Sequence, residues 1–471
     1  MSEELGLKSK VDVTIRSTSH PSNVYRPEVD TSGVDERKLM WKIDIRLIPW
    51  LALLYLLNFL DRGSIGNARL YGMEKSLHIT DKQYLIALTV FFFPYSLFEP
   101  PSNLALKWLR PSRWLSLILL IWGVAMTLHG VAQSYGGLIG LRFVLGLAEA
   151  GLYPGIVFYI TCWYKRSELG TRVAAFFSSA TVAGAFSGLL AAAIHNMDGV
   201  GGKPGWAWIF ILEGLATVLV ATVSFWVIQD FPDTVKFLSE AERVFVVRRL
   251  QEDMQFSAGG EIFRLSVIWQ CLSDWKTWVA MGMYMGVVGP GFAFSLFTPT
   301  ILNQLGFQAT ASNLLSVPVY VWACIITPAL SYFATYLAAS SIYPTIPNSV
   351  AWVSSNVEGS YKRSAVLGMA IGFGNLNGAV TSNVYRAQDK PWYSLGHGIV
   401  LTYIAIGWLC SLLYLVLLRR ENARRERGER DEVITGDDNK NADGERNGRF
   451  DSVEDARREK GDMWSGFRYT L

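Results

Sequence analysis

Charged residues are scarce over long parts of this 471-residue chain. Residues 277–357 contain no Asp, Glu, Lys or Arg, and four other long stretches hold at most one ionisable group each. These four stretches are 114–133, 173–195, 206–229 and 397–418. At about 1.5 Å per residue, a helix of about 20 residues crosses the roughly 30 Å hydrocarbon core of a bilayer. The scarcity of charge excludes an ordinary soluble protein and predicts an all-α polytopic protein in a lipid bilayer.

Cysteine and the common catalytic motifs are also scarce. The four cysteines show no CxxC or other metal-ligand spacing, so we interpret them as small buried apolar side chains. They are Cys162, Cys271, Cys324 and Cys410. No GxSxG, HExxH, Walker or GxGxxG motif occurs in a fitting context, which argues against an enzyme. The net charge of only +3 gives no reason to expect a nucleic-acid partner.

The apolar stretches and the links between them define the expected topology. Spans are expected at 47–70, 84–106, 114–133, 137–161, 173–195, 206–229, 277–301, 364–385 and 397–418, with one further crossing in 309–352. Lys and Arg gather in alternate links, which places these links and both termini on the cytoplasmic side. The sequence therefore predicts ten spans.

These spans divide the chain into five segments. The expected segments are a disordered cytoplasmic tail at 1–40, a six-helix bundle at 41–230, a cytoplasmic linker at 231–276, a second bundle of four spans at 277–418, and a disordered, charged cytoplasmic tail at 419–471. The two tails are rich in charge or proline and poor in apolar residues, which is typical of disorder. The first tail also lacks the features of a cleavable signal peptide.

The two halves of the chain resemble each other at a constant offset along the sequence. The stretch "AGLYPGI" at 150–156 matches "SSIYPTI" at 340–346, and two glycines further along in each half keep the same offset. Two halves of six spans each, joined by a cytoplasmic linker, are common in secondary transporters. The repeat therefore favours a transporter with two related bundles.

The second half is shorter than this repeat implies. The interval from Leu77 to Tyr153 is twice as long as the interval from the counterpart of Leu77, Leu305, to Tyr343. Half of the interval, including a basic loop, is therefore missing from the second half. We expect the region 309–352 to be the start of one helix joined to the end of another.

Two apolar spans nevertheless carry charges well inside the membrane. "FLDRGS" in the first span holds Asp61 and Arg62, and "LRFVLGLAEAG" in the fourth span holds Arg142 and Glu149. A charge at this depth is costly unless it pairs with another or faces water. Arg142 and Glu149 are two helical turns apart, so they share one helix face at a separation of about 10 Å. We expect the four charges to neutralise one another across a polar cavity, with a purely structural ion-pair network as the alternative.

Two other acids have simpler interpretations. Glu99 in "FEPPSN" is expected near the inner end of the second span, where it would help to hold the basic loop. Glu213 in "ILEGLA" is expected to pair with a basic group where helices pack. Neither is expected to belong to a binding site.

Several motifs together resemble one family of transporters. They are "LLNFLDRGSIGNA", "FEPPSNLALKWLRPSRWL", "RFVLGLAEAGLYPG", "WAWIFILEG", "DFPDT", "GNLNGAVTSNVY" and "GFRYTL". Over roughly residues 35–420 the chain is similar to the major facilitator superfamily, and within it to the anion:cation symporter family and its fungal allantoate/nicotinate permease-like branch. The resemblance implies two pseudo-symmetric helix bundles, here with about ten spans in place of twelve.

The resemblance also implies a function. Such a protein is a monomeric symporter in the plasma membrane that moves a small organic anion, a carboxylate or vitamin-like nutrient, together with protons by alternating access. No cofactor is implied, because the proton gradient drives the cycle. Arg62 would meet the substrate carboxylate, and Asp61 and Glu149 would carry protons. Arg142 would hold the neighbouring charges.

The second half would contribute two polar side chains. Asn375 and Asn377 in "GNLNG" would contact the substrate, with a plain hydrogen bond to a neighbouring helix as the alternative for each. Other functions stay open at this point: a non-transporting nutrient receptor of the same fold, a membrane enzyme, or an inactive product of a truncated gene model or of splicing.

Overall fold

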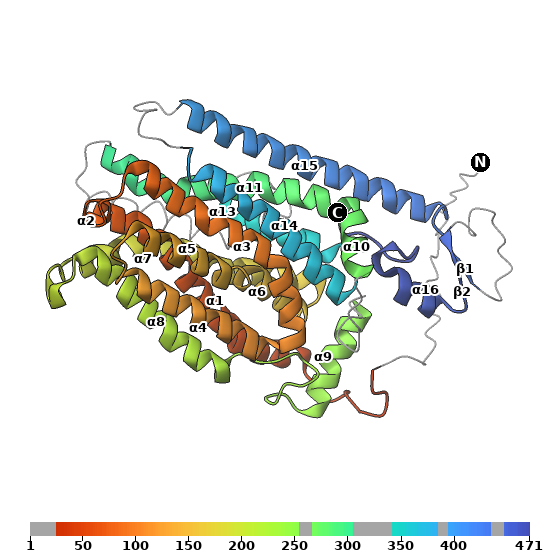
Figure 1. Ribbon diagram of the computed structural model, residues 1–471. Helices are drawn as coiled ribbons and strands as arrows, with labels where there is room; N and C mark the ends of the chain where they lie inside the picture. The colour runs from red at the N-terminus through yellow and green to blue at the C-terminus, as the bar shows by residue number, and fades with distance from the viewer. Residues whose placement is uncertain (1–24, 254–265, 305–341, 385–393, 435–446) are drawn as a thin grey trace, which may run out of the picture.

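Long helices make up most of the chain (Figure 1). The computed structural model describes residues 25–253, 266–304, 342–384, 394–434 and 447–471. The helices are α1 (Glu36–Leu70), α2 (Met73–Ser76), α3 (Asp81–Leu109), α4 (Pro111–His129), α5 (Tyr135–Glu149), α6 (Leu152–Thr161), α7 (Arg166–His195), α8 (Gly205–Val227), α9 (Glu240–Glu252), α10 (Ser266–Ser273), α11 (Trp275–Gln304), α13 (Ile342–Ser355), α14 (Ser360–Thr381), α15 (Ser394–Glu426) and α16 (Val453–Lys460). Two 3-10 turns, η1 (Val200–Gly202) and η5 (Gly461–Met463), and a two-stranded parallel pair, β1 (Val433–Ile434) with β2 (Arg449–Phe450), complete the described elements.

Six stretches within these described ranges are long and apolar enough to cross a membrane. They are α1, α4, residues 135–161, α7, α8 and residues 398–426 of α15. Long apolar helices are thus confirmed for six of the predicted spans, 47–70, 114–133, 137–161, 173–195, 206–229 and 397–418. The number of spans stays a prediction, because most of the region 309–352 lies outside the described residues.

Local sequence explains where several helices begin. The Asp35 side chain accepts a hydrogen bond from the backbone N–H of Lys38 at the start of α1. Thr80 and Gln83 form a reciprocal capping box at the start of α3. Pro111 occupies the first position of α4, where no intrahelical donor is needed. These caps satisfy backbone groups that the helices leave unpaired, and they fix where the long apolar faces begin.

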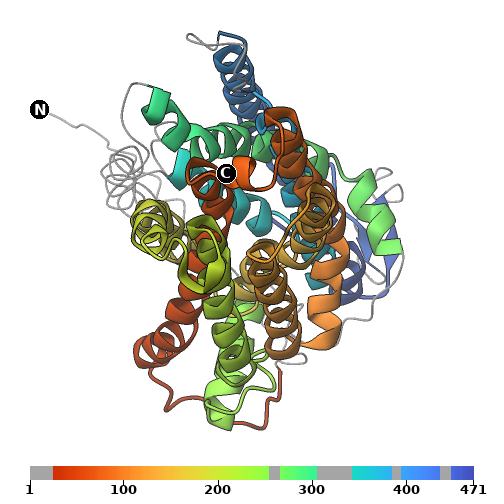
Figure 2. The same ribbon diagram turned by 60° about the vertical axis from the view of Figure 1, so that its left-hand side comes forward.

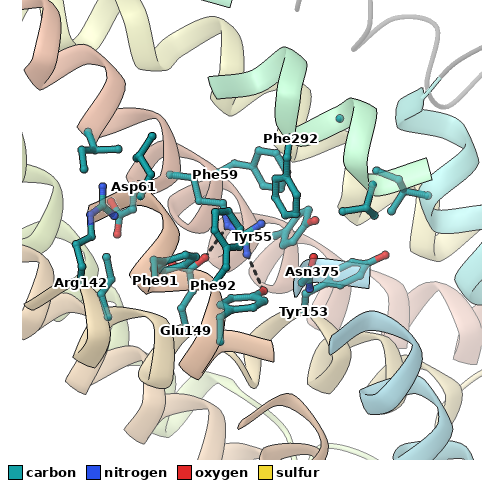
Figure 3. A pocket seen from close by; sticks show the side chains of 18 of the residues that line it. Tyr55, Phe59, Asp61, Phe91, Phe92, Arg142, Glu149, Tyr153, Phe292 and Asn375 are labelled. Atoms are coloured by element: carbon teal, nitrogen blue, oxygen red, sulfur yellow. Dashed lines mark hydrogen bonds and ion pairs between the residues drawn. The ribbon is translucent and has the colours of Figure 1, made fainter. Parts of the chain in front are cut away.

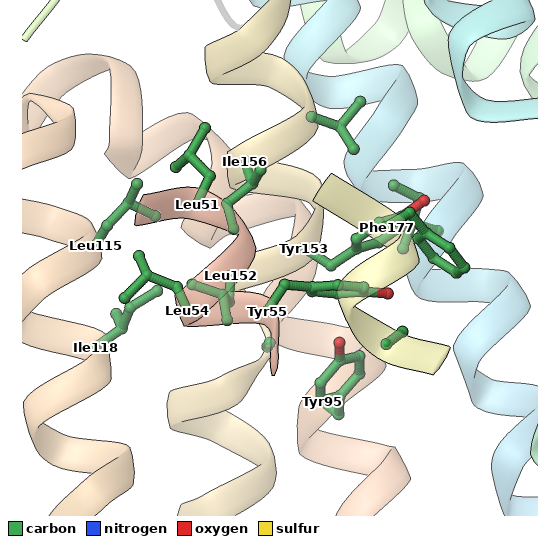
Figure 4. Packing of buried hydrophobic residues seen from close by; sticks show 14 of the residues in the cluster. Leu51, Leu54, Tyr55, Tyr95, Leu115, Ile118, Leu152, Tyr153, Ile156 and Phe177 are labelled. Carbon is green, nitrogen blue, oxygen red and sulfur yellow. The ribbon is translucent and has the colours of Figure 1, made fainter. Parts of the chain in front are cut away.

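The first half is a bundle in which α1 packs against α7, α4 against α8, and α3 against α5. Its core is aliphatic next to α4 and aromatic next to α7 (Figure 4). Leu51 and Leu54 of α1 lie towards Leu115 and Ile118 of α4. Next to Leu54 in the chain, Tyr55 stacks on Tyr153 of α6 and packs edge-on against Phe176 of α7.

In the second half, α11 packs against both α14 and α15. Gly286 of α11 and Gly407 of α15 make the second contact possible, because a Cβ on Gly286 would overlap the backbone of Gly407. In both views α15 lies at the edge of the molecule (Figures 1 and 2). It is also the least buried of the six membrane-length stretches in the described ranges. Its outer face is therefore left to contact lipid.

The two halves meet through contacts that follow the sequence repeat. The constant offset pairs Tyr153 of α6 with Tyr343 of α13, and Gly184 of α7 with Gly374 of α14. In space, α6 packs against α14 while α13 packs against α7. Each of α6 and α7 thus contacts the counterpart of the other, as a pseudo-two-fold relation requires.

The length difference between the halves persists in the structure. The interval between the end of α1 at Leu70 and the start of α6 at Leu152 is more than twice as long as the interval between the end of α11 at Gln304 and the start of α13 at Ile342. In the first half this interval holds α3, α4 and α5, which have 29, 19 and 15 residues. The interval 305–341 has fewer residues than these three helices together.

The fourth span, predicted over 137–161, is confirmed as one membrane-length stretch at 135–161, and two helices make it up. The α5 helix ends at Glu149, and α6 begins at Leu152. Pro154 explains the break, because its ring would clash with the carbonyl of Ala150 and it has no N–H to donate. Ala150 and Gly151 keep right-handed helical backbone angles between the two helices, and Glu149 is the last residue of α5.

The charged C-terminal segment is folded over the residues described, whereas the sequence predicts disorder from residue 419. The α15 helix continues to Glu426, and residues 447–471 fold back onto α11, α13, α14 and the end of α15. A highly charged composition favours disorder because charged side chains are normally hydrated. Here the buried Asp462 instead forms ion pairs with Lys276 and Lys362. Phe467 and Tyr469 are also buried.

Part of the N-terminal segment departs from the expected disorder as well. The guanidinium of Arg248 in α9 donates to the backbone oxygens of Tyr25, Arg26 and Val29, and to the Thr31 hydroxyl. Residues 1–24 lie outside the described residues. The linker 231–276 likewise contains two helices, α9 and α10.

Candidate functional site

A cavity lies between the two halves, at the level of the buried charges (Figure 3). It holds about 870 Å³ of space between atoms, part of which is open to the surroundings. The first half supplies residues from α1, α3, α5, α6 and α7, and the second half from α11, α13 and α14. The cavity therefore occupies the place where a rocking motion of the halves would expose a bound molecule first to one side and then to the other.

Arg62 and Glu149 form an ion pair on the wall of this cavity. Arg62 Nε donates to Glu149 Oε1 at 2.7 Å, and Arg62 Nη2 donates to the Tyr95 hydroxyl at 2.6 Å. Asn58 Nδ2 donates to the same Glu149 oxygen at 2.7 Å. The Glu149 side chain is 1% exposed and that of Arg62 is 14% exposed. The arginine thus faces the cavity, with the carboxylate behind it.

Asp61 and Arg142 lie together at one end of the cavity, away from Asn375 and Tyr153 (Figure 3). Both side chains are buried. Within the described ranges, neither carboxylate oxygen of Asp61 has a hydrogen-bond partner, and the same holds for Nε and Nη2 of Arg142. The two groups do not form an ion pair with each other there. The sequence correctly predicts that all four charges share one cavity, but only Arg62 and Glu149 are directly paired.

Aromatic rings form most of the remaining wall. The Arg62 guanidinium carbon lies 5.6 Å from the ring centre of Phe59, 5.0 Å from that of Tyr95 and 5.5 Å from that of Phe292. These distances allow cation–π attraction, which is strong where water is scarce. The cavity thus offers one accessible cation among flat apolar surfaces, a combination suited to a flat organic anion.

The two predicted asparagines differ in position. Asn375 lines the cavity, and its Nδ2 donates to Glu99 Oε1 of the other half at 2.6 Å. Asn377 donates to the backbone oxygen of Met285 in α11 at 3.1 Å and does not line the cavity. For Asn377 the structure favours the alternative of a plain interhelical hydrogen bond.

The structure corrects the interpretation of Glu99. This side chain is fully buried and bonds to Asn375, so it does not hold the basic loop. The observed α3, Asp81–Leu109, extends the predicted span 84–106 equally at both ends, so the depth of Glu99 is as predicted. The prediction fails because α14 of the other half packs against α3 and brings Asn375 to Glu99.

Glu213 is the other acid whose predicted surroundings are wrong. It is buried in α8 and accepts a hydrogen bond from the Ser64 hydroxyl, with no basic partner among the described residues. Ser64 lies one helical turn from Asp61, so Glu213 borders the same charged region. Its position within an apolar helix is visible in the sequence, but its neighbour in α1 is not.

Close helix contacts hold these side chains in place. A Cβ on Gly146 of α5 would overlap the Phe91 carbonyl oxygen of α3, and a Cβ on Gly151 would overlap the Ser102 hydroxyl, also of α3. Both glycines let α5 and the helix break approach α3, which brings Glu149 within reach of α1.

No group of three or more His, Cys, Asp or Glu side chains suited to a metal ion occurs in the part of the chain that the structure describes.

Comparison with known proteins gives consistent matches. The model of the Major Facilitator Superfamily matches residues 51–412. The MFS transporter prlL of Fungal sp. (strain NRRL 50135) is 33% identical over 480 aligned positions, covering 90% of this chain and 95% of that protein. The high-affinity nicotinic acid transporter of Saccharomyces cerevisiae is 28% identical over 428 positions, covering 83% of this chain and 79% of that protein.

The alignments also contain positions at which this chain has a gap. Ninety per cent of the chain is about 424 residues, so about 56 of the 480 positions aligned with prlL have no residue here. For the nicotinic acid transporter, 83% is about 391 residues, which leaves about 37 of 428 positions empty. The relatives therefore have residues inside the matched region that this chain lacks.

Solved structures agree on the fold. The proton:xylose symporter XylE bound to 6-bromo-6-deoxy-D-glucose superposes with a TM-score of 0.55 at 12% identity, covering 79% of this chain and 95% of that one. A double-tryptophan variant of XylE gives a TM-score of 0.54 at 14% identity, covering 78% and 94%. From its sequence relatives and its fold, the chain belongs to the major facilitator superfamily, whose members are membrane transporters and not enzymes.

Proposed function

We propose that this secondary transporter is a proton-coupled symporter for a small organic anion, and that it works by alternating access in the plasma membrane. Arg62 binds the substrate carboxylate, Glu149 and Asp61 carry protons, and Arg142 holds the charges around Asp61. Asn375 contributes a polar contact from the second half. Both termini lie on the cytoplasmic side.

The ion pair between Arg62 and Glu149 carries this proposal. A carboxylate substrate and the Glu149 carboxylate compete for the same guanidinium. When Glu149 takes up a proton, it loses its charge, and Arg62 becomes free to bind the substrate in the cavity. Binding of the anion and binding of the proton then favour each other, which is the thermodynamic requirement for symport.

The shape of the cavity supports an organic anion with a flat apolar part. Phe59, Tyr95 and Phe292 surround the guanidinium, so an aromatic or planar acid can place its carboxylate on Arg62 and its ring between theirs. The relative in Saccharomyces cerevisiae is named as a transporter of nicotinic acid, which is an acid of this kind. Nicotinate is therefore the first substrate to test.

Two assays on purified protein test the proposal. Radiolabelled nicotinate and a panel of other carboxylates are offered to proteoliposomes with and without an inward proton gradient, and any uptake should require the gradient. Binding to the detergent-solubilised protein is measured in parallel between about pH 5 and about pH 8, and should weaken as pH rises because Glu149 reclaims Arg62. Binding of every carboxylate that is independent of pH would overturn the coupling mechanism.

The length deficit favours a second possibility for the chain as written, that it binds substrate but does not complete the transport cycle. Between α11 and α13 it has less than half as many residues as the first half has between α1 and α6, and the two relatives have residues that it lacks. Binding without uptake would be the result expected for such a chain. The binding assay therefore tests the site independently of the transport cycle.

A further inference from the structure

One side of the contact between the two halves is a single pair of antiparallel helices, α3 and α14. At one end, the Thr89 hydroxyl lies 3.2 Å from the Ser382 hydroxyl and accepts from Asn383 at 2.8 Å. Further along, Asn103 and Ser364 exchange two hydrogen bonds of 3.0 Å each. Between these polar pairs, Gly368 and Gly372 bring α14 directly against Pro100 and Glu99.

The opposite end of the α3–α14 pair is also in contact. The Lys107 ammonium lies 3.8 Å from the ring centre of Tyr361. The seam between α3 and α14 therefore extends along nearly the full length of both helices. Any motion that separates the halves on this side must break it.

Glu99 is the one carboxyl group among the side chains that form this seam in the described residues. It is fully buried, and its Oε1 accepts from Asn375 of the opposite half at 2.6 Å. Its Oε2 has no hydrogen-bond partner in the described ranges, and it faces the backbone of α14 so closely that a Cβ on Gly372 would lie 2.9 Å away. A buried carboxylate oxygen without a donor is unfavourable when it carries charge.

The other ionisable groups around Glu99 do not remove this difficulty. Facing it are Tyr95 on its own helix, Arg62 of α1, Glu149 of α5, Tyr153 of α6 and Tyr284 of α11. The cation among them, Arg62, is held by Glu149 and Tyr95. Glu149 carries the same charge as an ionised Glu99 and opposes it.

We propose that Glu99 is a proton-operated latch between the two halves, a positioning residue that closes the seam between α3 and α14 when it is protonated and opens it when it is ionised. In the closed seam the proton forms an O–H bond at Oε2, and Asn375 holds Oε1. When the seam opens, water reaches the carboxyl group, the O–H bond breaks, and the proton passes to that water. Glu99 thus releases a proton each time this side opens and takes up a proton each time it closes.

The purpose of this latch rests on the proposed proton-coupled cycle, but its test does not require transport. Trp108 at the end of α3 is 80% exposed, and Arg420 near the end of α15 is also exposed. Spin labels on cysteines at these two positions, in a full-length chain whose native cysteines are replaced by alanine, report the separation of the halves in lipid nanodiscs. The distance distribution is recorded between about pH 5 and about pH 8, without substrate.

The labelled protein should change from mainly short to mainly long distances as pH rises, with the short population falling at least about twofold. Glu99→Gln keeps the shape and the Asn375 bond but cannot ionise, so its short population should persist at every pH. Asn375→Ala removes the bond from the other half, so long distances should dominate at every pH. Ser364→Ala is the matched control, since it removes a neutral bond from the same seam, and it should keep the response to pH.

Three outcomes would overturn the latch. The first is a response to pH in Glu99→Gln that equals that of the labelled parent. The second is loss of the response in Ser364→Ala, which would mean that any bond in the seam suffices. The third is loss of the response in Glu149→Gln with its retention in Glu99→Gln, which would assign the titration to Glu149. A chain that binds no carboxylate but keeps the predicted response would refute the proposed substrate and leave the latch standing.

Discussion

At the scale of single residues, Arg62 and Glu149 stand at the centre of the proposed coupling. Glu149→Gln keeps the size of the side chain and its hydrogen bond to Asn58, but it cannot release a proton. Tested in a chain whose second half has been lengthened by a helix–basic loop–helix segment, this variant should accumulate substrate under a proton gradient only to a ratio of about 1, because the proton no longer drives the cycle. Exchange of pre-loaded substrate should survive. Normal accumulation by this variant would show that Glu149 is only structural.

Arg62→Lys tests the substrate contact itself. A lysine keeps the positive charge but cannot donate to Glu149 and Tyr95 at once while presenting a planar face to a carboxylate. The apparent affinity for nicotinate should therefore fall at least about tenfold, measured as KM in uptake or as Kd in direct binding. An unchanged affinity, at equal amounts of folded protein, would remove Arg62 from the binding site.

The sequence predicts which residues are unusual better than it predicts what they face. Depth inside an apolar span identifies Asp61, Arg62 and Glu149, since a charge there needs a special environment. The prediction for Glu99 fails because its partner, Asn375, comes from the other half of the chain through the packing of α14 on α3. Glu213 has apolar residues of α8 on both sides in the sequence, and it meets Ser64 only because α8 packs against α1. Partners from distant helices are a property of the fold.

At the scale of elements, the sequence predicts the positions of helices well and their interruptions poorly. The predicted span 206–229 and the observed α8 helix, Gly205–Val227, nearly coincide. By contrast, the predicted span 137–161, although found as one membrane-length stretch, is interrupted between α5 and α6. Hydropathy cannot register such a break, because proline and glycine are both compatible with an apolar span. The break matters, since it places Glu149 at the end of α5.

The C-terminal segment allows a prediction of stability at this scale. Burial alone would raise the pKa of Asp462, but the ammonium groups of Lys276 and Lys362 outweigh it and hold that pKa below its usual value of 3.8. Asp462→Asn leaves two buried lysines with Asp274 as their remaining carboxylate, so we expect a loss of about 3 kcal/mol in unfolding free energy. Thermal unfolding of the purified protein measures this loss. Glu459→Gln, on the exposed face of α16, is the control and should change little.

The same lowered pKa fixes how this difference depends on pH. Because the folded pKa lies below 3.8, the stabilisation from Asp462 is complete above that value and is lost as pH falls through the folded pKa. The difference in unfolding temperature between the parent protein and Asp462→Asn should stay constant from about pH 8 to about pH 5 and shrink only in stronger acid. A difference that disappears near neutral pH would refute the pairing.

At the scale of the whole molecule, the repeat predicts the pairing of the halves. The constant sequence offset makes α13 the counterpart of α6 and α14 the counterpart of α7. In the structure α6 packs against α14, and α7 packs against α13. The relative placement of bundles follows from this symmetry, so a sequence with a detectable repeat contains information about its own tertiary structure. The site between the halves is harder to predict, because its shape depends on the side chains of both.

The shortened second half gives the last prediction. The chain as written should insert with both termini cytoplasmic but show little uptake, because the second half has too few residues to match the faces of the first. Insertion of a helix–basic loop–helix segment between about Thr327 and Tyr336, which lie outside the described residues, should raise uptake well above background. Both chains are compared at equal surface expression. Equal, robust uptake would show that ten spans suffice.

The burial of Asp462 has a consequence for how the protein is made. Lys276 and Lys362 are synthesised long before Asp462, which follows every membrane-length helix in the described ranges. Until Asp462 has left the ribosome, Asp274 is the one carboxylate among the described residues that pairs with these two ammonium groups, so their positive charges are not both neutralised. The second bundle therefore reaches its final packing only after its last helix has been translated. Termination of translation between Glu426 and Asp462 would leave a chain that has all the membrane-length helices of the described ranges but lacks the carboxylate that pairs with Lys276 and Lys362.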